Sequence, residues 1–141
     1  MENILDGYTT FNQAMWLFNS GLDPNTADLC YDLGSDPNDP SIIICPFKDV
    51  YDEYDLPDGD AIPCWTLGRL LSLFPEKIRI PEQVSPNPLI LVVYPKKEIR
   101  YENGFDDIVE FGDNLMESAV KMALFLYAHN YLPKQENIQE K

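Results

Sequence analysis

The chain has 141 residues, of which 45% are apolar, and this is enough to build one hydrophobic core and too little for two domains. It carries 24 acidic residues against 10 basic ones, which gives a net charge of −14. Because such a surface repels phosphate groups, we expect neither a nucleic-acid backbone nor an anionic membrane as a direct partner.

The first predicted element is a helix over 11–20. Thr10 and Gln13 have the spacing of a capping box, in which the threonine hydroxyl accepts a hydrogen bond from a backbone N–H three residues on. Gly21 supplies the stop signal. The apolar residues that follow helical spacing and form the predicted buried face are Phe11, Ala14, Met15 and Phe18.

The segment 23–60 holds most of the negative charge. It contains five prolines and eleven acidic residues against one base, Lys48. Within it, the β-branched run at 42–45 predicts a buried strand, and 50–54 is a second strand candidate. Turn-forming residues at 35–40 and 58–59 bracket these two runs.

After the acidic segment, apolar residues at helical spacing predict a second helix over 65–74, which Pro75 ends. Short strands are expected at 78–80 and 89–94, the latter forming a hairpin with 98–101. A third helix, capped by Asp113 or Asn114, is expected to run to Asn130.

The resulting order is α-β-β-α-β-β-α. It indicates an α+β fold in which a small, mainly antiparallel sheet is packed by about three helices. We expect a single domain over 1–132, with a polar tail at 133–141.

The three cysteines are odd in number and lack a Cys-x-x-Cys pair, so they favour reduced thiols over a disulfide framework or a zinc site. Cys64 precedes the second predicted helix, and His129 is the only histidine available as a base for a thiol nucleophile. Nothing in the sequence brings the two together, so we interpret Cys64 as a core residue and assign no catalytic residue.

An acidic cluster at 49–60 offers oxygen ligands of the kind that calcium prefers. The spacing fails as an EF-hand, because aligning Gly59 with the loop glycine puts Tyr54, Leu56 and Trp65 at ligand positions. Phosphate-binding loops, the Gly-x-Ser-x-Gly elbow and His-Glu-x-x-His are also missing. No metal or cofactor is therefore assigned, although a calcium-binding protein or a small hydrolase using 49–60 remains an alternative.

Aromatic residues lie among these acids, and this pattern favours a surface that binds a basic protein, because charge steers the encounter and rings supply buried contact area. The candidate binding residues are Tyr51, Asp52, Tyr54, Asp55 and Trp65; Tyr31 and Phe47 are further aromatics in the pattern. One alternative is an inhibitor that mimics nucleic acid; another is a solvated acidic surface with the tyrosines in the core. An edge strand of the 89–101 hairpin could also form a homodimer.

Three parts of the chain carry a resemblance: the early helix ending in Gly-Leu-Asp-Pro, the segment 62–75 and the segment 117–132. Together they resemble small uncharacterised proteins of Bacteroides-type gut bacteria, often associated with prophages or other mobile elements. The resemblance does not extend over 23–60, and its motifs are hydrophobic patterns and helix stops. It implies a bacterial cytosol and no activity.

The chain start also lacks a signal peptide, and the longest apolar run of the chain is too short to span a bilayer, so a cytoplasmic location is expected.

Overall fold

The computed structural model describes residues 7–32, 41–43, 61–94 and 97–132, and it has a small α+β fold. The helices are α2 (Phe11–Ser20), α4 (Leu67–Ser72) and α5 (Leu115–Ala128), with a 3₁₀ turn η1 (Pro24–Thr26). A three-stranded sheet has the order β2-β1-β3 and a four-stranded sheet the order β4-β5-β6-β7, with antiparallel pairs throughout. The strands are β1 (Leu29–Asp32), β2 (Ser41–Ile43), β3 (Ala61–Cys64), β4 (Lys77–Ile78), β5 (Leu89–Tyr94), β6 (Glu98–Glu102) and β7 (Asp107–Phe111).

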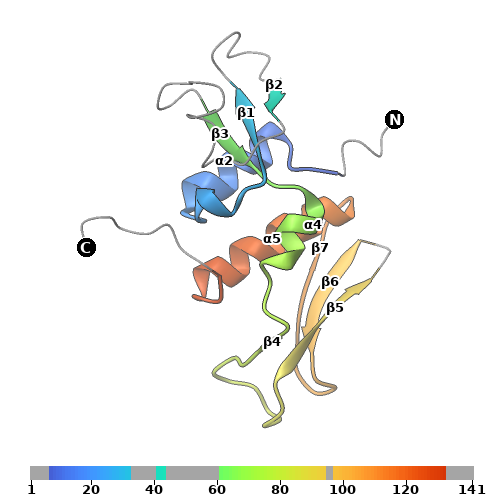
Figure 1. The fold of residues 1–141 in the computed structure, drawn as a ribbon. Helices are drawn as coiled ribbons and strands as arrows, with labels where there is room; N and C mark the ends of the chain where they lie inside the picture. The colour runs from blue at the N-terminus through green and yellow to red at the C-terminus, as the bar shows by residue number, and fades with distance from the viewer. Residues whose placement is uncertain (1–6, 33–40, 44–60, 95–96, 133–141) are drawn as a thin grey trace, which may run out of the picture.

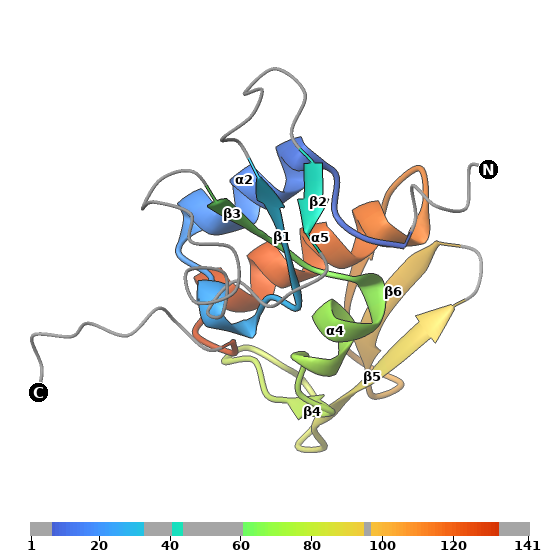
Figure 2. The same cartoon turned by 45° about the horizontal axis from the view of Figure 1, so that its top comes forward.

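Helix α5 lies at the centre of the molecule (Figure 1). It packs on β6 and β7 on one side, on α4 beside it, and on α2 on the other side. Helix α2 in turn packs on β3, so it separates the three-stranded sheet from α5 (Figure 2). The four-stranded sheet therefore has one face covered by α5, and no described helix packs on its other face.

Two groups of buried apolar side chains hold these layers together. The larger group fills the space between α4, α5 and the four-stranded sheet, and it includes Trp65, Leu89, Ile99 and Tyr101. The smaller group lies between α2 and the three-stranded sheet and consists of Ala14, Leu29, Tyr31, Ile62 and Cys64, with partly buried neighbours. Burial of this apolar surface is the main favourable term in the stability of the fold.

The helix predictions are confirmed closely, because the signals that set helix ends are local. Helix α2 spans 11–20, and both hydrogen bonds of the Thr10–Gln13 capping box are present. Asn114 caps α5 by accepting from the N–H of Glu117. Helix α4 is shorter than predicted, because the Thr66 side chain caps it and leaves Trp65 outside.

The strand predictions are only partly confirmed. The hairpin of β5 and β6 is present, and the runs at 42–45 and 78–80 correspond to β2 and β4 with shifted bounds. Strands β1, β3 and β7 were not predicted, so the described order is α-β-β-β-α-β-β-β-β-α, and there are two sheets where one was expected. The candidate strand 50–54 and the tail 133–141 lie outside the described residues.

Candidate protein-binding surface

Of the five predicted binding residues, the structure describes only Trp65, and it corrects that prediction. Trp65 is fully buried, and its indole Nε1 donates a hydrogen bond of 3.0 Å to Thr26 Oγ1. A side chain in the core cannot anchor a partner, so Trp65 is not part of a binding surface. Tyr51, Asp52, Tyr54 and Asp55 lie outside the described residues.

Tyr31 is the aromatic residue of the segment 23–60 that the structure describes, and it is also buried. Its hydroxyl donates a hydrogen bond of 2.7 Å to the carbonyl of Thr9, and burial raises the pKa of this phenol. Its ring packs edge-on against Phe11 of α2, with ring centroids 5.4 Å apart. For Tyr31 the alternative that places the tyrosines in the core is therefore confirmed.

Two described acids of the segment 23–60 act as caps. Asp23 accepts a hydrogen bond of 3.0 Å from the N–H of Asn25 at the start of η1. Asp28 accepts two hydrogen bonds from Thr66, one from its N–H at 2.9 Å and one from its hydroxyl at 2.5 Å. These carboxylates stabilise local structure, because they satisfy donors at helix starts.

The structure confirms the interpretation of Cys64 as a core residue. Cys64 is buried, Thr9 Oγ1 donates to its sulfur at 3.4 Å, and burial raises the pKa of the thiol to about 11. A thiol with this pKa is almost entirely protonated at neutral pH and is a poor nucleophile. His129 is exposed at the end of α5, where its Nδ1 lies 2.9 Å from the carbonyl oxygen of Phe125. Among the described residues, both side chains thus have other partners.

Neither a metal centre nor a membrane-spanning helix occurs among the described residues. They contain no group of three or more His, Cys, Asp or Glu residues placed to hold a metal ion. The acidic cluster 49–60 lies outside them, so it remains a prediction. No helix of the described chain has the length and apolar character needed to cross a bilayer.

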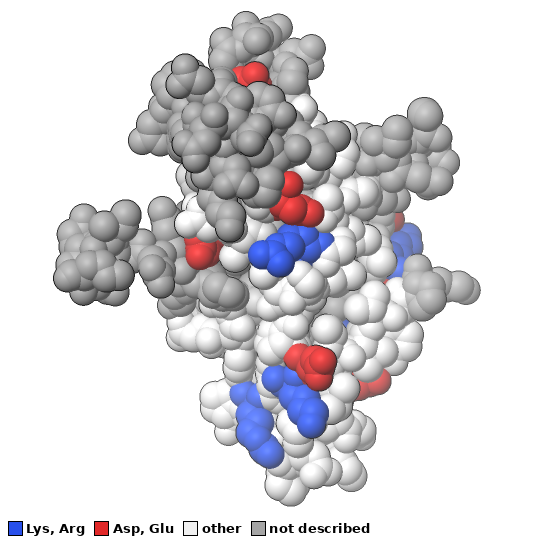
Figure 3. All heavy atoms as spheres, viewed as in Figure 1, with Lys and Arg blue, Asp and Glu red and all other residues white. Residues whose placement is uncertain are grey.

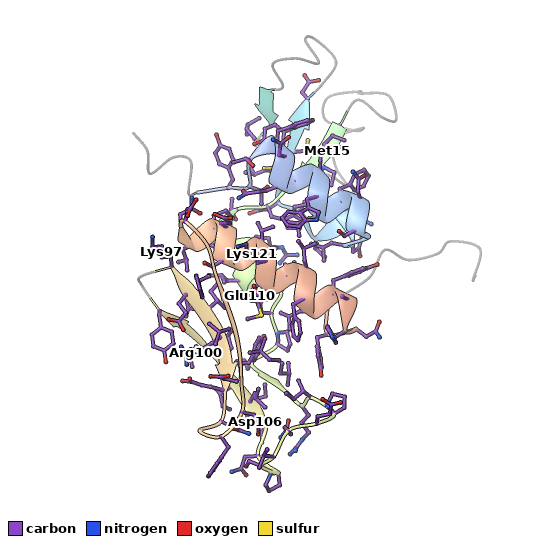
Figure 4. All side chains as sticks on the ribbon, turned by 180° about the vertical axis from the view of Figure 1, so that it is seen from behind. Met15, Lys97, Arg100, Asp106, Glu110 and Lys121 are labelled. Atoms are coloured by element: carbon purple, nitrogen blue, oxygen red, sulfur yellow. The ribbon has the colours of Figure 1, made fainter. Side chains whose placement is uncertain are left out.

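The uncovered face of the four-stranded sheet carries a group of exposed and partly exposed side chains that interact with one another. Side chains alternate between the two faces of a strand, and Leu89, Ile99 and Tyr101 point into the core. Their sequence neighbours therefore point away from α5. We call this set the outer face; its members are Ile90, Val92, Tyr94, Glu98, Arg100, Glu102, Asp107, Val109 and Phe111. In Figure 4, Arg100 lies out on the sheet, whereas Glu110 lies nearer to α5.

Arg100 is the centre of the outer face. Its guanidinium pairs with Glu98, lies 3.3 Å from a carboxylate oxygen of Glu102, and lies 3.7 Å from one of Asp107. The Tyr94 ring lies beside it, with 5.3 Å from the guanidinium carbon to the ring centroid, and the Tyr94 hydroxyl donates to Glu102 at 3.1 Å. One positive charge thus faces three negative ones, so the cluster keeps a net negative charge.

The electrostatics of the cluster follow from these hydrogen bonds. The bond to Glu98 raises the pKa of Arg100, because it stabilises the charged guanidinium. The bond to Glu102 raises the pKa of Tyr94, because the carboxylate stabilises the protonated phenol. The carboxylates of Glu98 and Glu102 are only about one-third exposed, which holds their orientation while leaving oxygen atoms open to a partner.

Apolar side chains surround this charged centre. Val92 and Val109 flank Arg100 directly across the sheet. Ile90 is 42% exposed and Phe111 is 66% exposed, so both offer apolar contact area on this face. Charged groups that are fixed in place beside accessible apolar area are typical of protein-binding surfaces.

Each end of the outer face is hollowed. One hollow of about 620 Å³ lies where β7 leads into α5, and it is lined by Lys97, Glu98, Phe111, Gly112, Asp113, Glu117 and Lys121. The other, of about 210 Å³, is lined by Arg100, Glu102, Gly104, Phe105, Asp106 and Asp107. The outer face is therefore a shallow sheet surface with a concavity at either end.

Asp106 fixes the loop next to the smaller hollow. Its carboxylate accepts hydrogen bonds from the N–H groups of Val84 at 2.9 Å and Ser85 at 3.1 Å, and these bonds lower its pKa. They hold the exposed Val84 near the exposed Phe105, and these two side chains, with Ser85 and Pro86, line a small hollow of about 250 Å³. This extends the apolar area at the end of the sheet.

On the face shown in Figure 3, the described surface is not uniformly acidic. In the view of Figure 3, basic and acidic side chains lie next to one another on the described part of the molecule. Local arrangement, and not total charge alone, must therefore decide where a basic partner binds. On the outer face, that arrangement is the cluster around Arg100.

Sequence reasoning did not identify Tyr94, Arg100 or Phe111 as site residues. The signal was present: Glu98, Arg100 and Glu102 occupy every second position of a predicted strand, which places three charges on one face. The apolar side chains that complete the face come from strands β5 and β7, and β7 was not predicted.

Comparisons with known proteins identify no relative of this chain. No protein-family model matches it, no curated protein matches it, and no solved structure matches it. The resemblance to proteins of Bacteroides-type bacteria therefore stays a prediction, and a function has to be argued from the geometry of the surface.

Proposed function

We propose that this chain is a non-enzymatic protein-binding module, and that the outer face of its four-stranded sheet binds a basic partner protein. The observation that carries the proposal is the cluster around Arg100, in which three carboxylates share one guanidinium on a sheet face that no described helix covers. The excess negative charge attracts a basic group, and the fixed geometry gives it a defined place to bind.

Contact area for the partner comes from the apolar side chains around the cluster. Phe111 and Ile90 are exposed, and aromatic and aliphatic anchors of this kind supply much of the free energy at protein interfaces. The partner's Lys or Arg side chains would approach Glu102 and Asp107, whose oxygens Arg100 engages at 3.3 and 3.7 Å. Burial of these pairs by the surrounding apolar contacts would strengthen them.

The wider setting is part of the same proposal. The partner is expected in the cytoplasm of a bacterium, and the protein would be an accessory protein of a mobile element, as the resemblance of segments 62–75 and 117–132 implies. Tyr51, Asp52, Tyr54 and Asp55 remain in the proposal as a second contact region, because they combine acids and aromatics next to β3 in the sequence. Trp65 no longer belongs to it.

The test is capture of a partner with matched variants. Immobilised wild-type protein would be exposed to a cytosolic extract of a Bacteroides-type gut bacterium at low and high salt. Phe111→Ser and Glu102→Gln alter the outer face. Their controls are Trp16→Ser, which removes another exposed apolar side chain on α2, and Glu82→Gln, which makes the same charge change in the loop after β4.

We expect a basic protein that elutes as salt rises, because exposed charge attraction is screened over about 10 Å at 0.1 M salt. Its retention should fall with Phe111→Ser and Glu102→Gln and remain with both controls. Equal loss with Trp16→Ser or Glu82→Gln would refute the outer face as the binding surface. Competition by duplex DNA for the same partner would identify it as a nucleic-acid-binding protein and the chain as a mimic.

A further inference from the structure

Strand β7 forms an outer edge of the four-stranded sheet, and the directions of its backbone groups can be assigned. The N–H of Asn103 bonds to the carbonyl of Asp106 across the hairpin turn, so the groups of Asp106 point toward β6. Because these directions alternate along an antiparallel strand, the groups of Asp107, Val109 and Phe111 point away from β6. The Phe111 carbonyl confirms this, since it accepts a hydrogen bond of 3.2 Å from Lys121 Nζ.

Strand β7 has five residues and is the longer of the two edge strands of this sheet, since β4 has two. On the opposite side, β4 pairs with Leu89 and Ile90, and the carbonyl of Glu76 accepts from the N–H of Leu91. On β7, no described residue bonds to the outward N–H and C=O groups of Asp107 and Val109. An edge strand that is free of proline and has such open groups at Asp107 and Val109 is a template for pairing with another strand.

We infer that β7 pairs with β7 of a second copy of this chain in antiparallel register about Val109, so that the two four-stranded sheets join into one. The sequence Asp107-Ile108-Val109-Glu110-Phe111 is complementary to itself in this register. Val109 lies opposite the second Val109, Asp107 lies opposite Phe111, and Ile108 lies opposite Glu110. In this register no acidic residue faces another acidic residue. A register centred on Ile108 or Glu110 would bring acidic residues opposite one another.

The second copy also covers apolar area that the single chain leaves exposed. Phe111 and Val109 both lie on the outer face, so in this register each exposed Phe111 ring is a diagonal neighbour of Val109 in the other copy. The outward backbone groups of Asp107 and Phe111 in one copy meet those of Phe111 and Asp107 in the other copy, and the two Val109 residues meet each other. Hydrogen bonds and ring contacts therefore form at the same edge.

Charge gives this association a signature that separates it from binding of a basic partner. Each copy carries a net charge of −14, so two copies repel one another, and salt that screens this repulsion strengthens the dimer. Binding of a basic partner has the opposite dependence, because salt screens attraction. The inference rests on the β7 edge alone and does not depend on the proposed function.

The experiment is sedimentation equilibrium on the full chain at about 0.05 M and about 0.5 M NaCl. Val109→Lys places two ammonium groups opposite one another at the symmetry axis. Val109→Pro removes the outward N–H while leaving the β6–β7 hydrogen bonds in place, because that N–H does not take part in them. The control is Val92→Lys, which puts the same charge on the other flank of Arg100, on β5 and away from the edge.

We expect wild type and Val92→Lys to form dimers that tighten with salt. Val109→Lys and Val109→Pro should raise the dimer dissociation constant about tenfold or more while keeping the wild-type circular dichroism. A wild-type chain that stays monomeric at about 200 µM and high salt would overturn the inference. It would also be overturned by a dimer that both Val109 variants leave intact.

Discussion

Replacing Trp65 tests whether this side chain belongs to the core or to an exposed surface. As a surface anchor, Trp65 could be changed to alanine with little effect on folding. In the structure it is fully buried in the main core, and its Nε1 donates to Thr26 Oγ1. Trp65→Ala therefore removes a large side chain from the core and leaves a cavity there.

The magnitude follows from these contacts. Truncating a buried tryptophan to alanine costs about 3–5 kcal/mol of unfolding free energy. The lost hydrogen bond adds little, because the Thr26 hydroxyl still donates to the carbonyl of Asp23 at 2.6 Å. With a urea dependence of about 2 kcal/mol per molar, the unfolding midpoint should fall by about 2 M. This is a large share of the total stability of about 5–15 kcal/mol that is usual for a domain.

The assay is equilibrium unfolding in urea, followed by circular dichroism at 222 nm. Trp16→Ala is the control, because Trp16 is 53% exposed on α2 and its loss should change stability by about 0.5 kcal/mol or less. If Trp65→Ala does not fold, Trp65→Phe should still lose about 1–2 kcal/mol. A loss below about 1 kcal/mol for Trp65→Ala would refute its place in the core.

Three further outcomes follow from single residues. The N–H groups of Val84 and Ser85 lower the pKa of Asp106 in the folded state. The stability that this carboxylate contributes is therefore present above its unfolded pKa and is lost as pH falls through its folded pKa. NMR titration should give Asp106 a pKa below that of free aspartate, and a normal pKa would contradict the contact. In a variant with Cys30 and Cys45 replaced by alanine, Cys64 of the folded protein should react with a disulfide reagent at pH 8 about 100-fold more slowly than Cys64 of the protein unfolded in urea. The reason is that the pKa of the thiol is raised to about 11 in the folded state. Equal rates would refute the burial of Cys64. Gly21→Ala should cost about 1–2 kcal/mol by thermal unfolding, because Gly21 has φ 109° and a Cβ there would collide with the Tyr127 hydroxyl; an unchanged midpoint would contradict this.

The helices could be predicted because their ends are set by residues close in sequence. Thr10 and Gln13 define the start of α2, and Asn114 defines the start of α5. Helical spacing of apolar residues then gives the length of each helix. These signals need no knowledge of the rest of the chain.

The strands of the three-stranded sheet could not be predicted in the same way. Strand β3 contains Pro63, which argues against a strand in a sequence, yet Pro63 pairs with Cys30 at the edge of the sheet, where a missing N–H is tolerated. This pairing joins residues more than 30 positions apart. No local pattern contains that information.

The assignment of Trp65 to the binding surface was wrong for a related reason. Trp65 follows an acidic segment, so its neighbours suggested exposure, but its side chain packs in the main core, and its hydrogen bonds go to Thr9 and Thr26 far away in sequence. The outer face joins side chains of β5, β6 and β7, and only the strand pairing shows that Tyr94, Arg100 and Phe111 share a surface.

Binding of a basic protein to the outer face can be tested by photo-crosslinking in cells of a Bacteroides-type bacterium. A photoreactive amino acid would replace Phe111 in one variant and Trp16, which is exposed elsewhere on the molecule, in another. We expect a discrete adduct with a basic protein from position 111, lost in the Glu102→Gln background, and no adduct from position 16. The same adducts from both positions, or none from position 111, would contradict binding at the outer face.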